Sequence, residues 1–316
     1  MGLSARQRGI WPTVLKIDLP DLPLPGTGST SERFRGLTAM GRRDLVAARL
    51  AEGHVDALAI AAELGYDHRV TVGERWGVWA AVPHSVRATQ GPDGWRVTGD
   101  RPWCSGAAWC TDALITAIAD DGIRLFAIPN GRPHAEPIDG TWPAVGMAAS
   151  DSRTVRLTNA PARPVGDPGR YVDRPGFWHG GIGVAAVWFG GALGVADTLY
   201  AAARAKELDP HALAHLGAVE VALAAAGAVL EAAAAEIDAD PAGDAHRLAL
   251  RVRATVEAAA TEVLDRVGRA LGAGPLCRDA DHGRRVADLT AYLRQSHAEA
   301  DLEQLGRLAA GDDMPW

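Results

Sequence analysis

Apolar residues recur at three- and four-residue intervals between positions 34 and 60, after a proline-rich stretch over residues 1–28. Prolines remove backbone donors, so that stretch is expected to be an extended lead-in. The capping-box pattern at Ser29-Thr30-Ser31-Glu32 predicts the start of a helix. Two short helices are expected, with a break near Gly53 and an end at Gly65. We assign residues 1–72 to a short N-terminal helical domain.

From Gly73 to about Val165, the pattern changes to short apolar and β-branched segments separated by Gly, Pro and Asp clusters. The clearest segments are 95–98, 113–116, 125–128 and 154–157. Strands this close together, with no helices between them, predict an antiparallel barrel or sandwich and exclude a parallel dinucleotide-binding sheet. We assign residues 73–175 to this β middle domain.

Alanine-rich sequence with helical spacing follows Gly176. It predicts long helices over about 179–206, 211–237, 242–271 and 281–309. Asp-Pro pairs at 209–210 and 240–241 each combine an N-cap residue with a proline suited to the first helical turn. Residues 176–316 are therefore expected to form a C-terminal four-helix bundle, and the fold class is α+β.

Charge and cysteine content exclude several classes of function. A net charge of -7 argues against a nucleic-acid partner, because phosphate binding needs a clustered basic excess. The three cysteines, Cys104, Cys110 and Cys277, are an odd number in a chain that begins without an apolar leader, so a disulfide framework and secretion are not expected. No uninterrupted apolar run reaches the ~20 residues that span a bilayer. The expectation is a cytoplasmic protein without membrane insertion.

One motif is more specific than the order of elements. Residues 95–107 read WRVTGDRPWCSGA and are followed by Asp112-Ala113-Leu114. This stretch resembles the middle domain of the acyl-CoA dehydrogenases. The segments 146–152 and 155–161 resemble the family's second middle-domain stretch, and 191–194 resembles its first bundle helix. The resemblance covers roughly residues 30–310, and it identifies residues 1–72 as a truncated form of the family's N-terminal helical domain.

The resemblance implies an FAD cofactor. Trp103 and Ser105 stand where the family places an indole and a hydroxyl against the flavin ring, which needs an apolar face and a donor near its N5 and O4 edge. Cys104, between them, is expected to be a packed apolar residue of this flavin-binding segment. Ala81, in Ala81-Val82-Pro83, replaces the threonine of the family's flavin-lining Thr-Glu-Pro.

Arg204 matches, by its spacing to Pro210 and His215, an arginine that reaches the FAD pyrophosphate of a neighbouring subunit. The resemblance therefore implies a homodimer or homotetramer. The alanine-rich helix expected over 211–237 also has more apolar surface than one bundle can bury.

The family reaction oxidises the CH–CH bond of an acyl thioester such as an acyl-CoA: a Glu removes a proton and the flavin accepts a hydride. An electron-transfer partner then reoxidises the flavin. The family's Glu lies nine residues after an Arg-Asp pair, and here His297 lies nine residues after Ala287-Asp288. Histidine can act as a base near neutral pH, so His297 is the candidate base. Its alternative is a helix residue bonded to Asp301 or Arg294, and two side chains at i and i+4 are too few for a metal site.

Two other functions stay open at this stage. A flavin-dependent monooxygenase on the same scaffold, in which reduced flavin meets oxygen, needs no Glu base. A non-catalytic family member that acts as a binding protein would also explain the absent Glu, the altered Thr-Glu-Pro segment and the short N-terminal domain.

Overall fold

The computed structural model describes residues 19–68, 71–81 and 85–311. These residues form two compact units. The first, here called the β unit, contains Arg49–Ala144 and Ala148–Phe177 together with the described residues before Leu22. The second, the helical unit, contains Leu22–Ala48, Val145–Met147 and the described chain from Trp178 onward.

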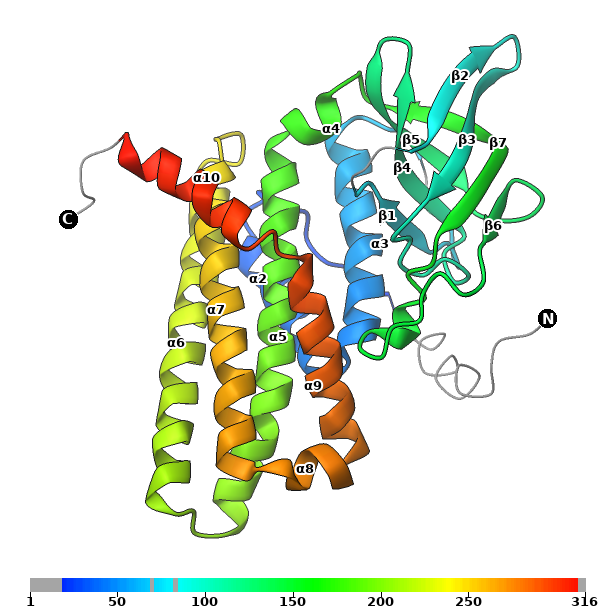
Figure 1. The fold of residues 1–316 in the computed structure, drawn as a ribbon. Coiled ribbons are helices and arrows are strands. Elements are labelled where there is room, and N and C mark those ends of the chain that lie inside the picture. The colour runs from blue at the N-terminus through cyan, green and yellow to red at the C-terminus, as the bar shows by residue number, and fades with distance from the viewer. Residues whose placement is uncertain (1–18, 69–70, 82–84, 312–316) are drawn as a thin grey trace. The chain divides into compact units, whose positions relative to one another are not determined.

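Seven strands form one sheet in the β unit (Figure 1). They are β1 Trp76–Trp79, β2 Arg87–Gly91, β3 Gly94–Arg101, β4 Asp112–Ala119, β5 Gly122–Pro129, β6 Ala135–Pro137 and β7 Val155–Val165. The order β4-β2-β3-β7-β5 closes into a barrel because β5 also pairs with β4. The predicted barrel is confirmed, with one difference: β1 and β2 both run parallel to β4, so the sheet is mixed.

The core of the β unit lies between the barrel and the second half of α3 (Leu45–Glu63). Ala57 and Ile60 of α3 pack against Trp76 of β1 and Leu114 of β4, and all four side chains are buried. Leu125 of β5 and Val165 of β7 belong to the same buried cluster, so the apolar face of α3 packs against four strands of the sheet. This packing explains why residues 49–63 belong to the same compact unit as the strands.

The two predicted N-terminal helices exist, but the predicted break near Gly53 is wrong. The helices are α2 (Thr30–Arg43) and α3, and they are separated at Asp44, whose backbone is extended. The Asp44 carboxylate accepts a hydrogen bond from the N–H of Ala47 at 2.9 Å and so supports the first turn of α3. Gly53 lies inside α3, where the helix tolerates it.

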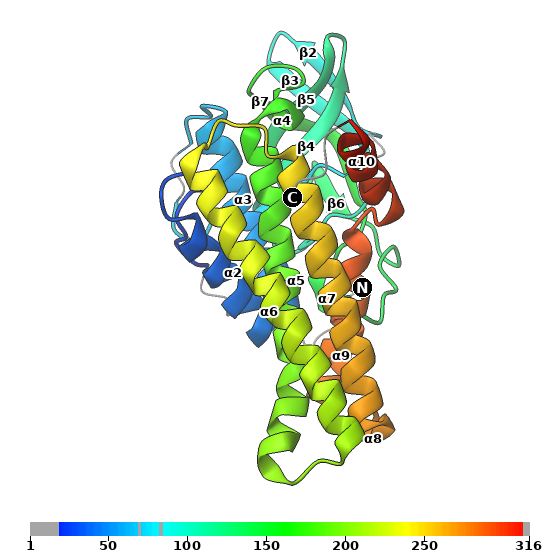
Figure 2. The ribbon, with the colours of Figure 1, turned by 90° about the vertical axis from the view of Figure 1, so that its left-hand side faces the viewer.

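The predicted four-helix bundle is confirmed in the helical unit, where four helices run alongside one another (Figure 2). They are α5 Pro175–Ala205, α6 Pro210–Ala239, α7 His246–Leu271 and α9 Ala280–Tyr292. The short elements are α4 Arg170–Asp173, α8 Ala273–Arg278 and α10 Glu299–Ala310. A single helix over 281–309 is wrong: a 3-10 turn follows Tyr292, and Ala298, with φ 45°, separates α9 from α10.

Glycines allow α2 to cross α5 closely. A Cβ added at Gly41 would lie 2.5 Å from the carbonyl oxygen of Val187, and one added at Gly190 would lie 2.2 Å from that of Thr38. A side chain at either position would therefore force the helices apart. The hydroxyl of Thr38 donates to the carbonyl of Ala186 at 3.1 Å, which strengthens the same crossing.

Helices α5 and α6 are each long and apolar enough to cross a membrane by length and composition. They differ in burial: 72% of the most apolar window of α5 is buried inside the structure, against 22% for α6. Leu213 and Val221 of α6 are 50% and 71% exposed. Helix α6 therefore presents an apolar face that the described residues do not cover.

Candidate flavin-binding site

A tight turn after β3 presents the indole of Trp103 to solvent. Trp103 has φ 63°, in the left-handed region that non-glycine residues rarely adopt, and its side chain is 58% exposed. Its ring lies edge-on to that of Trp142, with 5.9 Å between the centroids. Backbone strain of this kind persists only where the surroundings hold it, and it clusters at functional sites.

The surroundings that hold this turn are residues 150–153. The N–H groups of Cys104, Gly106 and Ala107 donate to the carbonyls of Arg153, Ser150 and Asp151, at 3.1, 2.7 and 3.1 Å. Asp151 is buried, and its carboxylate accepts from the N–H of Ala108 at 2.8 Å. The turn and this second segment therefore form one rigid platform, which we call the Trp103 platform (residues 103–108 and 150–153).

Three hydroxyls are linked inside the Trp103 platform. Ser105 Oγ lies 2.9 Å from Ser152 Oγ, which lies 2.8 Å from Ser150 Oγ. Ser150 and Ser152 are buried, whereas Ser105 is partly exposed. The indole N–H of Trp79 donates to the carbonyl of Ser105 at 3.0 Å and fixes the backbone beneath the hydroxyl.

Cys104 points away from solvent. Its side chain is fully buried, and its Sγ lies 3.1 Å from the carbonyl oxygen of Arg101. Burial raises the pKa of this thiol well above its usual range, so the group stays protonated near neutral pH. Contact between Cys104 and a ligand would therefore come from its backbone.

Arg101 is a buried cation whose guanidinium bonds to no carboxylate of the described residues. The side chain is fully buried, its Nε donates to the carbonyl of Trp79 at 2.7 Å, and its Nη2 donates to the carbonyl of Ala81 and the hydroxyl of Thr116. Its Nη1 is buried with no hydrogen-bond partner among the described residues. Burial lowers the pKa of Arg101. Val82, Pro83 and His84, which follow Ala81, lie outside the described residues.

Ser105 lines a small cleft of about 180 Å³, including its open mouth. It lies beside α3 and β1, and its wall includes Ser105, Gly77 and Cys110. A Cβ at Gly77 would lie 3.1 Å from the sulfur of Cys110, so the glycine keeps this wall open. Most of the described side chains that line the cleft are apolar, and Arg49 is the one charged residue among them.

The two remaining predicted site residues belong to the helical unit. Arg204 is exposed in the last turn of α5. His297 lies just before α10 with 72% of its side chain exposed, and its Nδ1 is 3.2 Å from the carboxylate of Asp301. This contact is the one expected for a structural helix residue. Within the described part of the chain, no three His, Cys, Asp or Glu side chains gather as a metal site would require.

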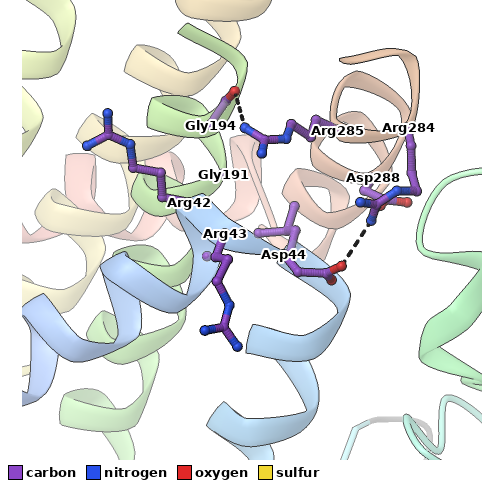
Figure 3. A pocket seen from close by; sticks show the side chains of 10 residues that line it. Arg42, Arg43, Asp44, Gly191, Gly194, Arg284, Arg285 and Asp288 are labelled. Atoms are coloured by element: carbon purple, nitrogen blue, oxygen red, sulfur yellow. Dashed lines mark hydrogen bonds and ion pairs between the residues drawn. The ribbon is translucent and has the colours of Figure 1, made fainter. Parts of the chain in front are cut away.

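A second cleft, of about 240 Å³ with its open mouth, lies where α2, α3, α5 and α9 meet in the helical unit (Figure 3). Four arginines line it, and three of them, Arg42, Arg284 and Arg285, lie within ion-pair distance of a carboxylate. Arg42 holds Asp197 through two bonds of 2.6 and 3.0 Å, and Arg284 lies 3.1 Å from Asp44. Arg285 donates to the carbonyl of Gly194 at 2.8 Å. We interpret this cleft as an ion-pair junction that holds the helices together.

Asp288, at the same junction, is a buried carboxyl group that binds a distant loop. Its Oδ1 accepts from the N–H of Met147 at 2.6 Å, and its Oδ2 lies 3.6 Å from Arg284. Burial raises its pKa to about 6, against the opposing effects of the Met147 hydrogen bond and the Arg284 charge. The junction therefore contains a group that titrates in the weakly acidic range.

Sequence reasoning missed the roles of Ser150, Ser152 and Arg101. The segment 146–152 was recognised as part of the family resemblance, but nothing in it predicts which hydroxyl faces Ser105. Arg101 lies two residues before Trp103, and its burial follows from closure of the barrel.

Comparison with known proteins gives the fold. Neither a known family profile nor a curated protein sequence matches the chain. Among solved structures, TdsC from Paenibacillus sp. A11-2 with FMN and indole has a TM-score of 0.78 at 19% identity, covering 90% of this chain and 84% of that one. KijD3 with FMN and dTDP-3-amino-2,3,6-trideoxy-4-keto-3-methyl-D-glucose has a TM-score of 0.77 at 19% identity, and the match covers 90% of this chain and 80% of that one. The methanesulfinate monooxygenase MsuC from Pseudomonas fluorescens has a TM-score of 0.75 at 18% identity, and the match covers 91% of this chain and 84% of that one. The chain has the acyl-CoA dehydrogenase-like fold of these proteins.

Proposed function

We propose that this chain is a flavin-dependent oxidoreductase, and specifically a monooxygenase, built on the acyl-CoA dehydrogenase-like fold. The observation that carries the proposal is the Trp103 platform, which holds an exposed indole on strained backbone beside the hydroxyl of Ser105. An isoalloxazine ring needs such an apolar face and a donor at its polar edge.

The residues present fit a flavin. Trp103 would cover the ring and Ser105 would bind its polar edge, and both residues are accessible to solvent. Solved structures of TdsC and KijD3 contain FMN, so FMN is proposed beside the FAD implied by the sequence resemblance.

Two observations favour oxygen chemistry over acyl-thioester dehydrogenation. The position expected for the catalytic base holds His297, which is largely exposed and lies against Asp301 rather than in an enclosed, water-free site. TdsC is a dibenzothiophene monooxygenase and MsuC a methanesulfinate monooxygenase. When bound and reduced, a flavin would supply the electron pair that activates molecular oxygen.

A second copy of the chain is proposed as a partner. The exposed apolar residues of α6, including Val221 at 71%, offer a surface for it. Arg204 is exposed and would be free to reach a cofactor phosphate of that copy. A separate electron-transfer protein that delivers reducing equivalents completes the proposed set of partners.

Flavin binding tests the proposal directly. Purified protein is titrated with FMN and with FAD, and flavin fluorescence and absorbance report binding. We expect binding of one of the two, and at least about tenfold weaker binding by Trp103→Ala, since loss of ring stacking costs about 1.4 kcal/mol or more. Trp178→Ala, in the helical unit, is the matched tryptophan control. A protein that binds neither flavin refutes the proposal and favours the non-catalytic binding protein.

Reactivity separates the two enzyme classes. Protein loaded with reduced flavin is mixed with oxygenated buffer, and candidate thioesters and aromatic compounds are added in turn. A monooxygenase gives a hydroxylated product and keeps its activity in His297→Ala. Reduction of the flavin by an acyl-CoA under anaerobic conditions, with activity lost in His297→Ala, would instead support the dehydrogenase.

A further inference from the structure

The three linked hydroxyls of the Trp103 platform can donate their hydrogen bonds in more than one order. Each serine hydroxyl has one proton to donate and lone pairs to accept. Three hydroxyls joined by two hydrogen bonds therefore leave one proton undonated, and its position depends on the order in which the groups donate.

Burial decides that order. Ser150 is 1% exposed, and its Oγ has Ser152 Oγ as its one hydrogen-bond partner within the described chain. If Ser105 donated to Ser152, the unused proton would lie on Ser150 or on Ser152, and both are buried. A buried donor without an acceptor costs about 1–3 kcal/mol. The favoured order is therefore Ser150 to Ser152 to Ser105, with the unused proton on Ser105.

Of the three serines, Ser105 is the one that is partly exposed and that lines a cleft. This is the cleft of about 180 Å³ in the β unit. The inward lone pair of Ser105 is occupied by Ser152 at 2.9 Å, which holds Oγ in place and strengthens its remaining donor through cooperativity along the chain. The arrangement makes Ser105 a fixed, outward-directed hydrogen-bond donor.

We propose that Ser150 and Ser152 are positioning residues that direct the Ser105 hydroxyl proton to N5 of an oxidised flavin. This inference rests on the proposed flavin-binding function and adds to it two residues that touch no ligand. The hydrogen bond favours the oxidised ring, because N5 accepts a hydrogen bond when oxidised and carries its own proton when reduced.

The experiment compares FMN with 5-deaza-FMN, in which a carbon replaces N5 and the acceptor is absent. If the titrations described above show FAD to be the ligand, FAD and 5-deaza-FAD are used. Wild-type protein is expected to bind the natural flavin about five- to tenfold more tightly than the deaza form, the value of one hydrogen bond of about 1–1.4 kcal/mol. This preference is the ratio of the two dissociation constants. A structural change that weakens the binding of both ligands by the same factor leaves the ratio unchanged.

Ser152→Ala is expected to lower the preference at least about threefold, because Ser105 Oγ loses its anchor and its inward donor. Ser152→Thr keeps the hydroxyl and is expected to restore the preference. Ser150→Ala, one step further along the chain, should lower it less. Ser85→Ala is the control, because that exposed hydroxyl donates to the carbonyl of Asp100 and has no hydrogen bond to another hydroxyl among the described residues.

The double variant Ser105→Ala/Ser152→Ala completes the test. Ser152→Ala should have no further effect on the preference once Ser105 is removed, since it acts through that hydroxyl. An unchanged preference in both Ser152→Ala and Ser150→Ala, with natural flavin still bound, overturns the relay and leaves the flavin-binding proposal standing. Failure of wild-type protein to bind either natural flavin overturns the proposed function, and the relay with it.

Discussion

Asp288 gives the helical unit a pH-dependent stability that can be calculated from its surroundings. The side chain is 4% exposed, and its pKa rises from the ordinary 3.8 to about 6 because burial disfavours the charged carboxylate. A carboxyl group with a higher pKa in the folded protein binds its proton more tightly when folded. The stabilisation is therefore complete below pH 3.8 and is lost as the pH rises to about 6.

The magnitude follows from the separation of the two pKa values. About two pH units correspond to about 3 kcal/mol, at roughly 1.36 kcal/mol per unit. Asp288→Asn removes the titration but keeps an oxygen that can accept from the N–H of Met147. The variant should therefore gain stability relative to wild type by about 2–3 kcal/mol between pH 4 and pH 7.5, with most of the change below pH 6.5.

Urea denaturation followed by circular dichroism, at half-unit steps across that range, measures the difference. Taking variant minus wild type cancels the titration of other groups that the substitution does not touch. Asp265→Asn is the control, because this aspartate is 54% exposed at an ion pair with Arg269 and such exposed pairs contribute at most about 1 kcal/mol. A flat difference for Asp288→Asn would refute the reasoning. A difference of opposite sign would mean that attraction to Arg284 outweighs burial.

Two further predictions concern the helical unit. The carboxylate of Asp238, in α6, accepts hydrogen bonds from the N–H and hydroxyl of Thr30 and from the N–H of Gly28, at 3.0, 2.6 and 3.1 Å. Asp238→Ala should therefore lower the free energy of unfolding in urea by about 2–3 kcal/mol near neutral pH. The control variant, Asp240→Ala, should lower it far less. Partial burial raises the pKa of Asp238, but the hydrogen bonds from Thr30 and Gly28 outweigh it and lower the pKa, so this stabilisation should fade at acidic pH as the carboxylate is protonated. In analytical ultracentrifugation, Val221→Arg should convert the proposed oligomer into a monomer, because it places a charge on the exposed apolar face of α6. The control variant, Val172→Arg, changes a residue that is 51% exposed on α4 and should leave the oligomer intact. A monomeric wild-type protein would contradict the proposed second copy.

Local pattern predicted the types and order of the elements because each depends on residues near in sequence. Helical spacing identified α2 and α3, and the segments 95–98, 113–116 and 125–128 all lie within barrel strands. The incorrect predictions concern the positions at which helices begin and end. The first helix breaks at Asp44 because its carboxylate caps the next helix, while Gly53 is accommodated inside α3. The last predicted helix divides where Ala298 adopts a positive φ, which an alanine gives no reason to expect.

The sequence by itself determined the helix–barrel–bundle order and the Trp-x-Ser turn, since periodicity and turn residues act over a few positions. Only the tertiary structure decided what that turn can do. Ser105 meets Ser152 across 47 residues, and Asp288 meets Met147 across 141. Arg101, at the end of β3, is fully buried in the folded protein. Burial and hydrogen-bond partners of this kind arise from packing between distant segments, and they set the donor direction of Ser105 and the pKa of Asp288.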